Sequence, residues 1–419
     1  MRRVCWAAWL VSVAAAFALG FMAPLRAGAQ APVPVGAEFQ VNTYTTSHQV
    51  GPAVATVANG GFVVVWFSNG SSGTDTSYSS IQGQRYASDG SKQGAQFQVN
   101  TFTTGYQLRP SVAADTGGDF VVVWESDGSS GIGTGPRSIQ GQRYASNGSP
   151  QGAQFQVNSY TTSSQSEASV TADSDGDFVV VWTSAGSSGT DTSASSVHGQ
   201  RYTSNGATQG GKFQVNTYTT SFQSGPSVAA GADGDFVVVW QSTGSFGTDT
   251  SPQSIQGQRY ASNGSPQGGE FQVNTYTTSF QRSPSVAVDS DGDFVVVWDS
   301  NGSSGTDTGD PFTAWGTSVE GQRYASDGST QGAQFQVNTY TTLGQYSPSV
   351  AVDADGGFVV VWNSAGSFAT DTSSYSIQGQ RYSVTAPAPP VPAMSPATRF
   401  ALAAALLLFG ATYGLRRRS

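Results

Sequence analysis

The residues best suited to chemistry in this chain are clusters of aspartates that recur at regular intervals. Three carboxylates fall within five residues at two places: Asp173, Asp175 and Asp177, and again Asp289, Asp291 and Asp293. Oxygen-rich clusters of this kind suit Ca²⁺. The matching segment nearest the N-terminus, residues 58–61, reads Ala-Asn-Gly-Gly and has no acid. A ligand set that is lost from some copies is more typical of turns, in which Asp bonds its own backbone. Calcium binding stays open as the second interpretation.

Six copies of the tetrapeptide Gly-Gln-Arg-Tyr form another set of candidates. They end at Tyr86, Tyr144, Tyr202, Tyr260, Tyr324 and Tyr382. A catalytic site must be asymmetric, whereas these arginines recur in every copy, so we interpret them as structural residues that stack on neighbouring aromatic rings. The arginines resemble those of sialidases, which are six-bladed propellers. The sialidase pattern Ser-x-Asp-x-Gly-x-Thr-Trp is not met, because no Thr precedes the Trp.

Two features break the repetition. The histidines, His48 and His198, lie at non-equivalent places and form neither a catalytic triad nor a metal-ligand spacing, so we expect both to be exposed. The fifth copy has a longer loop that contains Asp310, Phe312 and Trp315. An exposed aromatic pair beside a carboxylate predicts a binding patch for a sugar or a protein. The alternative is that these aromatic rings fold back onto their own repeat.

Self-similarity is the strongest pattern in the sequence. Copies begin at Gly36, Gly94, Gly152, Gly210, Gly268 and Gly332. Phe-Val-Val-Val-Trp recurs unchanged in each copy, starting at Phe62, Phe120, Phe178, Phe236, Phe294 and Phe358. The pattern predicts one domain of six repeats, spanning residues 36–93, 94–151, 152–209, 210–267, 268–331 and 332–382.

Each repeat is predicted to contain four strands, located here in the fifth copy. They are Phe271–Thr275, Ser285–Val288, Phe294–Trp298 and Val319–Tyr324. The third strand is apolar on both faces, so both faces must be covered. Four strands per repeat, one of them doubly buried, predict an all-β, six-bladed β-propeller. A linear β-solenoid is the alternative.

The turns between strands predict how the ring closes and where it binds. The turn from the fourth strand into the next repeat is short, so this hairpin should lie within one blade. Phe39–Thr43 is then expected to close the ring by pairing with Ile377–Tyr382, which removes an exposed sheet edge. The long loop after the third strand, such as Gly186–Ser193, shares one face with the Thr-Tyr-Thr-Thr segment. We expect any binding on this long-loop face.

Both ends of the chain carry targeting patterns. Residues 1–29 combine Arg2 and Arg3, an apolar stretch and a small-residue cleavage site, which is typical of a secretory signal peptide. Residues 383–398 are a Pro-rich linker. Residues 399–419 hold an apolar run and three final arginines, which predicts a transmembrane helix with its basic tail on the cytoplasmic side.

The linker and helix resemble bacterial C-terminal sorting signals of the PEP-CTERM/IPTL-CTERM type. The motif here reads Val391, Pro392, Ala393, Met394, Ser395 and differs from Ile-Pro-Thr-Leu-Ser at three positions. The resemblance implies a bacterial membrane as partner, a sorting peptidase that removes the helix, and a location in the cell envelope, on the outer surface or outside the cell. A permanent anchor is the alternative.

Charge and cysteine content exclude several functions. The region between the two ends holds 11 of the 18 basic residues and all 27 acidic residues, a net charge of −16. Such a surface disfavours nucleic acid. Cys5, the single cysteine, lies in the signal peptide, so the mature chain has no disulfide and no thiolate metal site. We expect no cofactor, with calcium as the one alternative.

The repeats resemble β-propeller-like modules of bacterial surface and secreted proteins. Because nearly every candidate side chain recurs around the ring, the sequence favours a non-enzymatic, secreted or surface-anchored protein. It would act as a scaffold, adhesion element or multivalent binding module for a glycan or a surface protein. The alternative hypothesis is a lectin or a glycan-active enzyme that uses the long-loop face.

Overall fold

The computed structural model describes residues 39–383, with gaps. The gaps are residues 71–72, 76–77, 128–136, 187–188, 192–193, 245–246, 248–252, 278, 302–316, 342, 354–355 and 366–374. The signal peptide, the sorting motif and the C-terminal apolar run therefore lie outside the described residues, as do Asp310, Phe312 and Trp315. Within the described part, no helix is long and apolar enough to cross a membrane.

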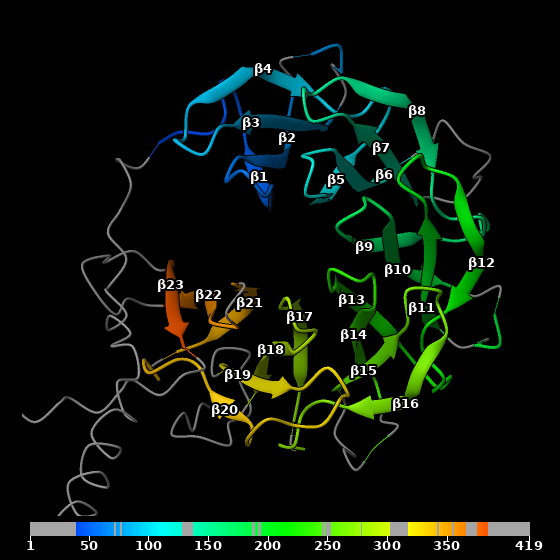
Figure 1. Cartoon of the computed structure of the whole chain (residues 1–419), viewed down its shortest axis with the longest axis vertical. Coiled ribbons are helices and arrows are strands. Elements are labelled where there is room, and N and C mark those ends of the chain that lie inside the picture. The colour runs from blue at the N-terminus through cyan, green and yellow to red at the C-terminus, as the bar shows by residue number, and fades with distance from the viewer. Residues whose placement is uncertain are drawn as a thin grey trace, which may run out of the picture. The chain divides into compact units, whose positions relative to one another are not determined.

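The repeats fold into six antiparallel sheets, each with its strands in sequence order, and the sheets are arranged as blades around an axis (Figure 1). The innermost strands are β1 (Gln49–Thr56), β5 (Gln107–Ala114), β9 (Gln165–Ala172), β13 (Gln223–Ala230), β17 (Gln281–Val288) and β21 (Gln345–Val352). The second strands are β2 (Phe62–Ser68), β6 (Phe120–Asp127), β10 (Phe178–Ala185), β14 (Phe236–Ser242), β18 (Phe294–Asn301) and β22 (Phe358–Ala365).

The third and fourth strands complete the blades. The third strands are β3 (Ser80–Tyr86), β7 (Arg137–Tyr144), β11 (Ser195–Tyr202), β15 (Ser254–Tyr260), β19 (Thr317–Tyr324) and β23 (Tyr375–Tyr382). The outer strands are β4 (Lys92–Gln98), β8 (Pro150–Gln156), β12 (Thr208–Gln214), β16 (Pro266–Gln272) and β20 (Phe335–Gln336). The predicted all-β, six-bladed propeller is confirmed, and so is the hairpin of third and outer strands within one blade.

The Phe-Val-Val-Val-Trp strands form the core because alternate residues point into different junctions. On β6, Val121 and Val123 pack in one cluster with β10 of the next blade. Phe120, Val122 and Trp124 pack in another cluster with β2 of the preceding blade. Burial of both faces removes most of each side chain from water, which contributes roughly 1.5–3 kcal/mol per large apolar residue.

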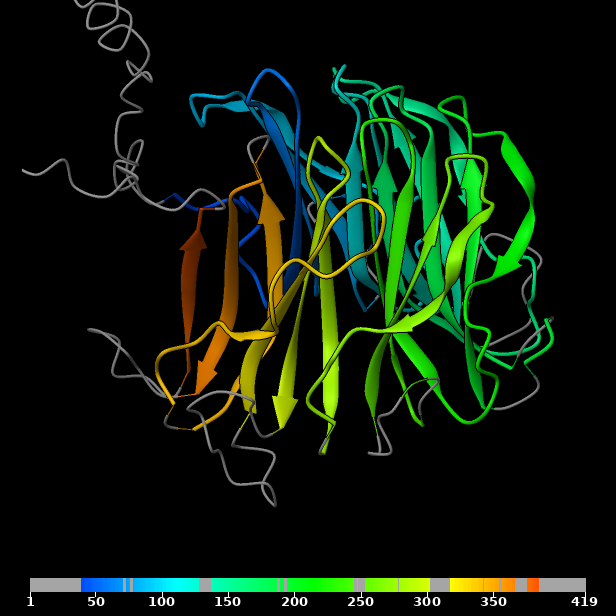
Figure 2. The same cartoon turned by 60° about the horizontal axis from the view of Figure 1, so that its bottom comes forward.

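The strands of all blades run between two ends of the propeller, as Figure 2 shows from the side. The short turns from first to second strand and from third to fourth strand share one end, which we call the tight-turn end. The other connections share the opposite end, which we call the long-loop end. At the tight turns Gly176 adopts a φ of 83° and Gly148 a φ of 87°, which favour glycine.

The predicted ring closure is wrong in this structure. Among the strands that the structure describes, β23 pairs only with β22, and Phe39–Thr43 forms no strand. Phe39 instead packs against Phe62 and Tyr86 of blade one, with ring centroids 6.5 and 5.2 Å apart. Phe97, which lies on the outer strand β4 of blade one, makes the same contacts with Phe120 and Tyr144 of blade two. Phe39 therefore contacts the blade that follows it, as Phe97 does, but it is not part of a paired strand.

Candidate functional site

In a molecule built from near-identical copies, the positions that differ between blades are the ones that can form an asymmetric site. Two such positions lie at the long-loop end. The first, on the innermost strand, holds Gly51, Arg109, Glu167, Gly225, Ser283 and Ser347. The second, directly after the Phe-Val-Val-Val-Trp motif, holds Phe67, Glu125, Thr183, Gln241, Asp299 and Asn363.

The first position is a β-bulge that requires a left-handed backbone. The register of β5 against β6 shifts between Leu108 and Ser111, and that of the other innermost strands shifts at the same place. The φ angles there are 48° at Arg109 and 56° at Glu167. Glycine fits this conformation easily, whereas a non-glycine residue is strained by about 1–3 kcal/mol. Two charged residues are thus held where the fold favours glycine.

The two positions are joined across the blade junctions by hydrogen bonds. Glu125 Oε1 accepts a hydrogen bond from the backbone N–H of Glu167 on the next blade (2.7 Å). In the same way the backbone N–H of Gly225 donates to Thr183 Oγ1 (3.1 Å). The backbone N–H of Ser347 donates to Asp299 Oδ1 (3.3 Å). The variable residues therefore form part of a band around the long-loop end of the innermost strands.

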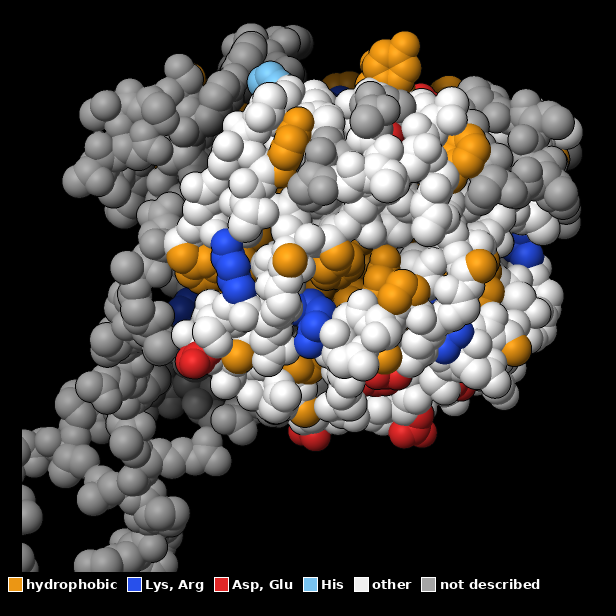
Figure 3. Space-filling model, turned by 90° about the horizontal axis from the view of Figure 1, so that it is seen from above, with side chains coloured by type: hydrophobic (Ala, Val, Ile, Leu, Met, Phe, Trp, Pro, Cys, Tyr) orange, Lys and Arg blue, Asp and Glu red, His pale blue; other side chains and the backbone are white. Residues whose placement is uncertain are grey.

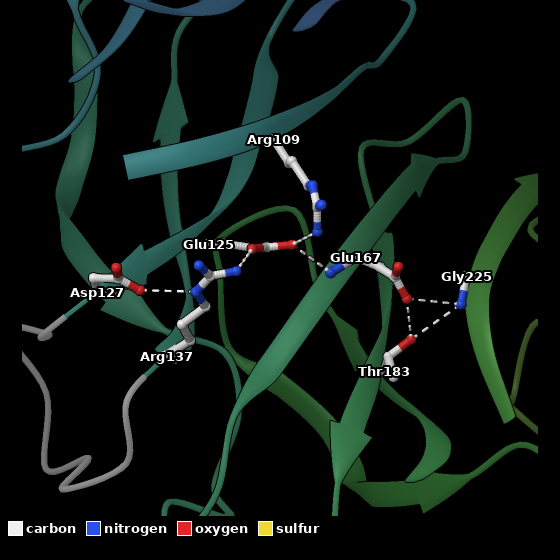
Figure 4. A network of polar contacts seen from close by, with 7 residues as sticks. All are labelled: Arg109, Glu125, Asp127, Arg137, Glu167, Thr183 and Gly225. Carbon is white, nitrogen blue, oxygen red and sulfur yellow. Dashed lines mark hydrogen bonds and ion pairs between the residues drawn. The ribbon is translucent and has the colours of Figure 1, made fainter. Parts of the chain in front are cut away.

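Glu125 is the centre of a charged network between blades two and three (Figure 4). Its carboxylate is 1 % exposed and accepts hydrogen bonds from Arg109 Nη1 (3.1 Å) and Arg137 Nη1 (3.2 Å). Arg137 also pairs with Asp127 through its Nε (2.8 Å). Two guanidinium groups and one backbone N–H therefore surround the Glu125 carboxyl group.

Glu167 lies beside this network in a more open environment (Figure 4). Its Oε2 accepts hydrogen bonds from Thr183 Oγ1 and from the backbone N–H of Gly225, both at 2.9 Å. Its Oε1 makes no hydrogen bond with the residues that the structure describes, and the side chain is partly exposed. One junction therefore holds two carboxyl groups in different surroundings, one enclosed by arginines and one open on one oxygen.

A third carboxyl group at the same type of position is Asp299 on β18. It is buried, and burial raises its pKa to about 6, although hydrogen bonds from Ser283 and Ser347 and the charge of Arg282 act in the opposite direction. Arg282 lies over the ring of Phe280, 4.1 Å from its centroid. Asp299 can therefore hold a proton at mildly acidic pH.

Aromatic side chains are exposed at the same end of the propeller. Tyr78 and Tyr106, which precede β3 and β5, stack with ring centroids 4.7 Å apart and are 65 % and 42 % exposed. Phe222, which precedes β13, is also exposed. Figure 3 shows apolar side chains protruding at one edge and acidic side chains at the opposite edge. Flat exposed rings are suited to contacts with sugar rings.

The aspartate clusters predicted from the sequence lie at the tight-turn end. Asp173 Oδ1 accepts hydrogen bonds from the backbone N–H groups of Asp175 and Asp177, both at 3.0 Å. Asp289 makes the same bonds to Asp291 and Asp293. Across the described part of the chain, no group of three acidic, histidine or cysteine residues is placed to hold a metal ion. The geometry is that of the turn interpretation.

The repeated arginines act between blades. Arg143 Nη1 donates to the backbone carbonyl of Asn205 in the tight turn of the next blade, and its Nη2 donates to Gln151 Oε1 (2.6 Å). The neighbouring Tyr144 stacks on Phe120, with centroids 4.8 Å apart. Arg85 and Arg201 make the same contacts in blades one and three, so these arginines are structural. They use hydrogen bonds where we expected stacking of the guanidinium on aromatic rings.

The prediction that both histidines are exposed is correct for His48 and wrong for His198. His198 is 1 % exposed, lies beside the Trp182 ring and shares a hydrogen bond with Ser196 Oγ (2.9 Å). It occupies the place that Gln140 has on β7, facing the blade interior. Burial lowers its pKa to about 4. Aligning the repeats would have revealed this position, because its equivalents are inward-facing residues of a covered strand.

Comparison with known proteins adds a fold relationship. No family model matches the sequence, and no curated protein matches it. The chain is similar to a protein of unknown function from Dyadobacter fermentans, with a TM-score of 0.52, 10 % identity, and 80 % of this chain and 94 % of that chain covered. It is also similar to a point mutant of the NanB sialidase from Streptococcus pneumoniae (TM-score 0.50, 8 % identity, 75 % and 65 % covered).

An α-L-arabinanase from Penicillium chrysogenum, solved with arabinobiose, matches with a TM-score of 0.48 and 16 % identity over 81 % of this chain and 94 % of that one. At these identities the likeness is one of fold. The expectation of a non-enzymatic scaffold is nevertheless contradicted, because a carbohydrate-active enzyme, the sialidase, stands among the propellers of similar fold. The alternative hypothesis, a lectin or a glycan-active enzyme, stays a hypothesis.

Proposed function

We propose that this chain is a carbohydrate-active enzyme that binds a glycan at the long-loop end and cleaves a glycosidic bond there. One observation carries the proposal: Glu125 and Glu167 break the repeat at a single junction and bring two carboxyl groups of different environment together. Hydrolysis of a glycosidic bond commonly uses two carboxyl groups in different protonation roles. The propeller fold shared with a sialidase is compatible with this activity.

The environments of the two carboxyl groups suggest their roles. Glu125 is enclosed by Arg109 and Arg137, and it holds the backbone of Glu167 in place through the 2.7 Å hydrogen bond. Glu167 presents an open oxygen, so it is the group that exchanges a proton with the glycosidic oxygen or with water. The exposed rings of Tyr78 and Tyr106 would bind the apolar face of a sugar unit.

The test is release of reducing sugar from a panel of polysaccharides and oligosaccharides. We expect turnover by the native chain and a loss of at least about 100-fold in kcat/KM for Glu167→Gln, since removal of acid–base catalysis commonly costs about 10²–10⁴-fold. Gln241→Ala, at the position equivalent to Glu125 in blade four, is the matched control and should stay within twofold. Unchanged activity of Glu167→Gln, or no turnover of any glycan by the folded protein, would overturn the proposal.

We also propose that the enzyme is exported and held at the bacterial envelope by its C-terminal helix. The support comes from the signal-peptide pattern in residues 1–29 and the apolar run with arginines in residues 399–419. Mass spectrometry of the cell-associated protein tests both ends. A chain that starts near Gln30 and stops near Met394 is expected if the sorting resemblance holds. A protein that retains residues 1–29 would contradict export.

A further inference from the structure

Cavities between neighbouring blades at the tight-turn end differ widely in size, although the blades are nearly identical. The cavity volume is about 250 Å³ between blades one and two and about 360 Å³ between blades four and five. At the two junctions between them the volumes are only about 30 and 50 Å³. A difference of this size within a repeat must come from particular residues.

The first residue of the turn between the innermost and second strands accounts for the difference. In blades two and three it is Asp115 and Asp173, whose carboxylates reach the next blade. A Cβ placed on Gly176 would lie 2.8 Å from Asp115 Oδ2, and one on Gly234 would lie 3.0 Å from Asp173 Oδ2. Blade one has Val57 and blade four has Gly231 at this place. The two wide cavities lie at the two junctions that lack this carboxylate.

The cavity between blades four and five has a fixed polar wall. Asp235 Oδ2 accepts a hydrogen bond from Gln267 Nε2 (2.7 Å), and Gln267 Oε1 accepts one from Arg259 Nη2 (3.1 Å). Asp291 and Ser326 of blade five face this wall across the cavity. Donors and acceptors are thus held in place before any ligand arrives, which lowers the entropic cost of binding.

The base of this cavity is aromatic. The rings of Phe236 and Tyr260 stack with centroids 4.8 Å apart and line the cavity together with Phe294. Small-molecule sites usually have volumes of about 300–1,000 Å³ and combine an apolar surface with a few fixed polar groups. The volume and lining are suited to one polyhydroxylated ring. The lining carboxylates of Asp233, Asp235, Asp291 and Asp327 outnumber the single guanidinium, which disfavours an acidic ligand.

We propose that the junction between blades four and five is a binding site for a single neutral or amino sugar, opened by Gly231 in place of the turn aspartate. The site lies at the opposite end of the propeller from Glu125 and Glu167, so it is separate from the proposed hydrolytic site. In this view the turn aspartates of blades two and three are plugs that close the equivalent junctions.

The test measures binding of glucose, glucosamine and glucuronate to the full chain by ligand-observed NMR. We expect saturable binding of glucosamine and glucose and at least tenfold weaker binding of glucuronate. Gly231→Asp introduces the residue that blades two, three, five and six carry, so the fold should be retained, as thermal unfolding can verify. This variant should weaken binding at least tenfold.

Two further variants keep the test decisive. Asp173→Gly removes the plug between blades three and four and should add a site, raising the binding stoichiometry by one. The loss of binding caused by Gly231→Asp should be the same in the native chain and in a Glu167→Gln background, which separates the inference from the proposed hydrolysis. Equal affinity of Gly231→Asp and the native chain, or no binding of any of the three sugars, would overturn the proposal.

Discussion

At the scale of single residues, each blade serves as a control for the other five. His198 and Asp299 show the value of this comparison, because both are titratable groups at positions where other blades carry neutral amides. His198 stands where blades one, two and four have Gln82, Gln140 and Gln256. The substitution that tests its role is therefore one that the fold already accommodates.

We expect His198 to make the protein sensitive to acid. Its folded-state pKa of about 4 lies below the ordinary value of 6.5, so the unfolded chain binds more protons between these pH values. Stability should be complete above about pH 6.5 and should fall by about 3 kcal/mol as the pH approaches 4. Urea unfolding at several pH values in this range gives the slope of the free energy of unfolding against pH, and this slope should be smaller for His198→Gln. An unchanged slope would mean that His198 is protonated without cost in the folded state.

Asp299 should have the opposite pH dependence. Burial raises its pKa to about 6 from the ordinary value of 3.8, so the folded state binds more protons between these values. Its contribution to stability is present at low pH and is lost as the pH rises through 6. Asp299→Asn introduces the residue that blade six has at Asn363 and should raise the free energy of unfolding by about 1–3 kcal/mol at pH 7.5. A loss of stability at that pH would contradict this reasoning.

The residues of the candidate site were the least predictable part of the molecule. Sequence analysis selected Asp173 and Asp289, because clustered carboxylates stand out in the sequence, yet these groups bond their own turns. Glu125 and Glu167 are 42 residues apart, and only the bulge and the blade junction bring them together. Comparing the six copies position by position would have marked both, because no other blade has a glutamate at either position.

At the scale of strands and turns, a recurring contact between glycine and phenylalanine holds the outer strands. A Cβ on Gly141 of β7 would lie 2.6 Å from the tip of the Phe155 ring on β8, and the equivalent glycines of the other four-stranded blades are covered in the same way. Gly379 on β23 is the exception, because a Cβ placed on it would lie 3.4 Å from Val361 Cγ1 and 3.5 Å from the carbonyl oxygen of Val360, which are ordinary contact distances. The Gly in Gly-Gln-Arg-Tyr is thus explained by the close approach of a ring.

This contact predicts different effects for the same substitution in two blades. Gly141→Ala should destabilise the protein by about 1–3 kcal/mol, because the added methyl group overpacks the Phe155 ring. Gly379→Ala should change stability by less than about 0.5 kcal/mol, since its surroundings can accept a Cβ. Chemical denaturation of both variants measures the difference. A destabilisation of similar size in the two blades would show that a ring also covers Gly379 in solution.

The central strands were predictable because the pattern of apolar residues indicates which faces of a strand are buried. Phe294–Trp298 is apolar on both faces, and the structure covers both faces. The outer strand was placed less well. It was expected at Phe271–Thr275 but spans Pro266–Gln272, since its first four residues, Pro-Gln-Gly-Gly, contain no large apolar side chain that would mark a strand. Alternation of apolar and polar side chains cannot mark a strand that begins without apolar residues.

At the scale of the whole propeller, the first and last blades differ from the inner four. Every inner blade packs on two neighbours, whereas blade six packs on blade five and leaves β23 without an outer partner strand. The sixth repeat, residues 332–382, ends with β23, but it retains the Ile and Val residues of the other copies, so the side-chain pattern gives no sign that its outer face is exposed. The repeated sequence thus determines the structure of each blade, whereas the exposure of the end blades depends on how the six blades are arranged (Figure 1).

The end blades supply the last prediction. Ile139 on β7 is fully buried, whereas the equivalent Ile377 on β23 is 70 % exposed. Ile139→Ala should cost about 2–5 kcal/mol through lost burial and the cavity that remains. Ile377→Ala should cost less than about 1 kcal/mol, because its side chain is already in water. The free energies of unfolding of the two variants measure this contrast.

If Ile377→Ala is as costly as Ile139→Ala, then the outer face of blade six is covered in solution, either by blade one of the same chain or by a second copy. Size-exclusion chromatography with light scattering separates those cases, since only the second gives a mass above that of the monomer.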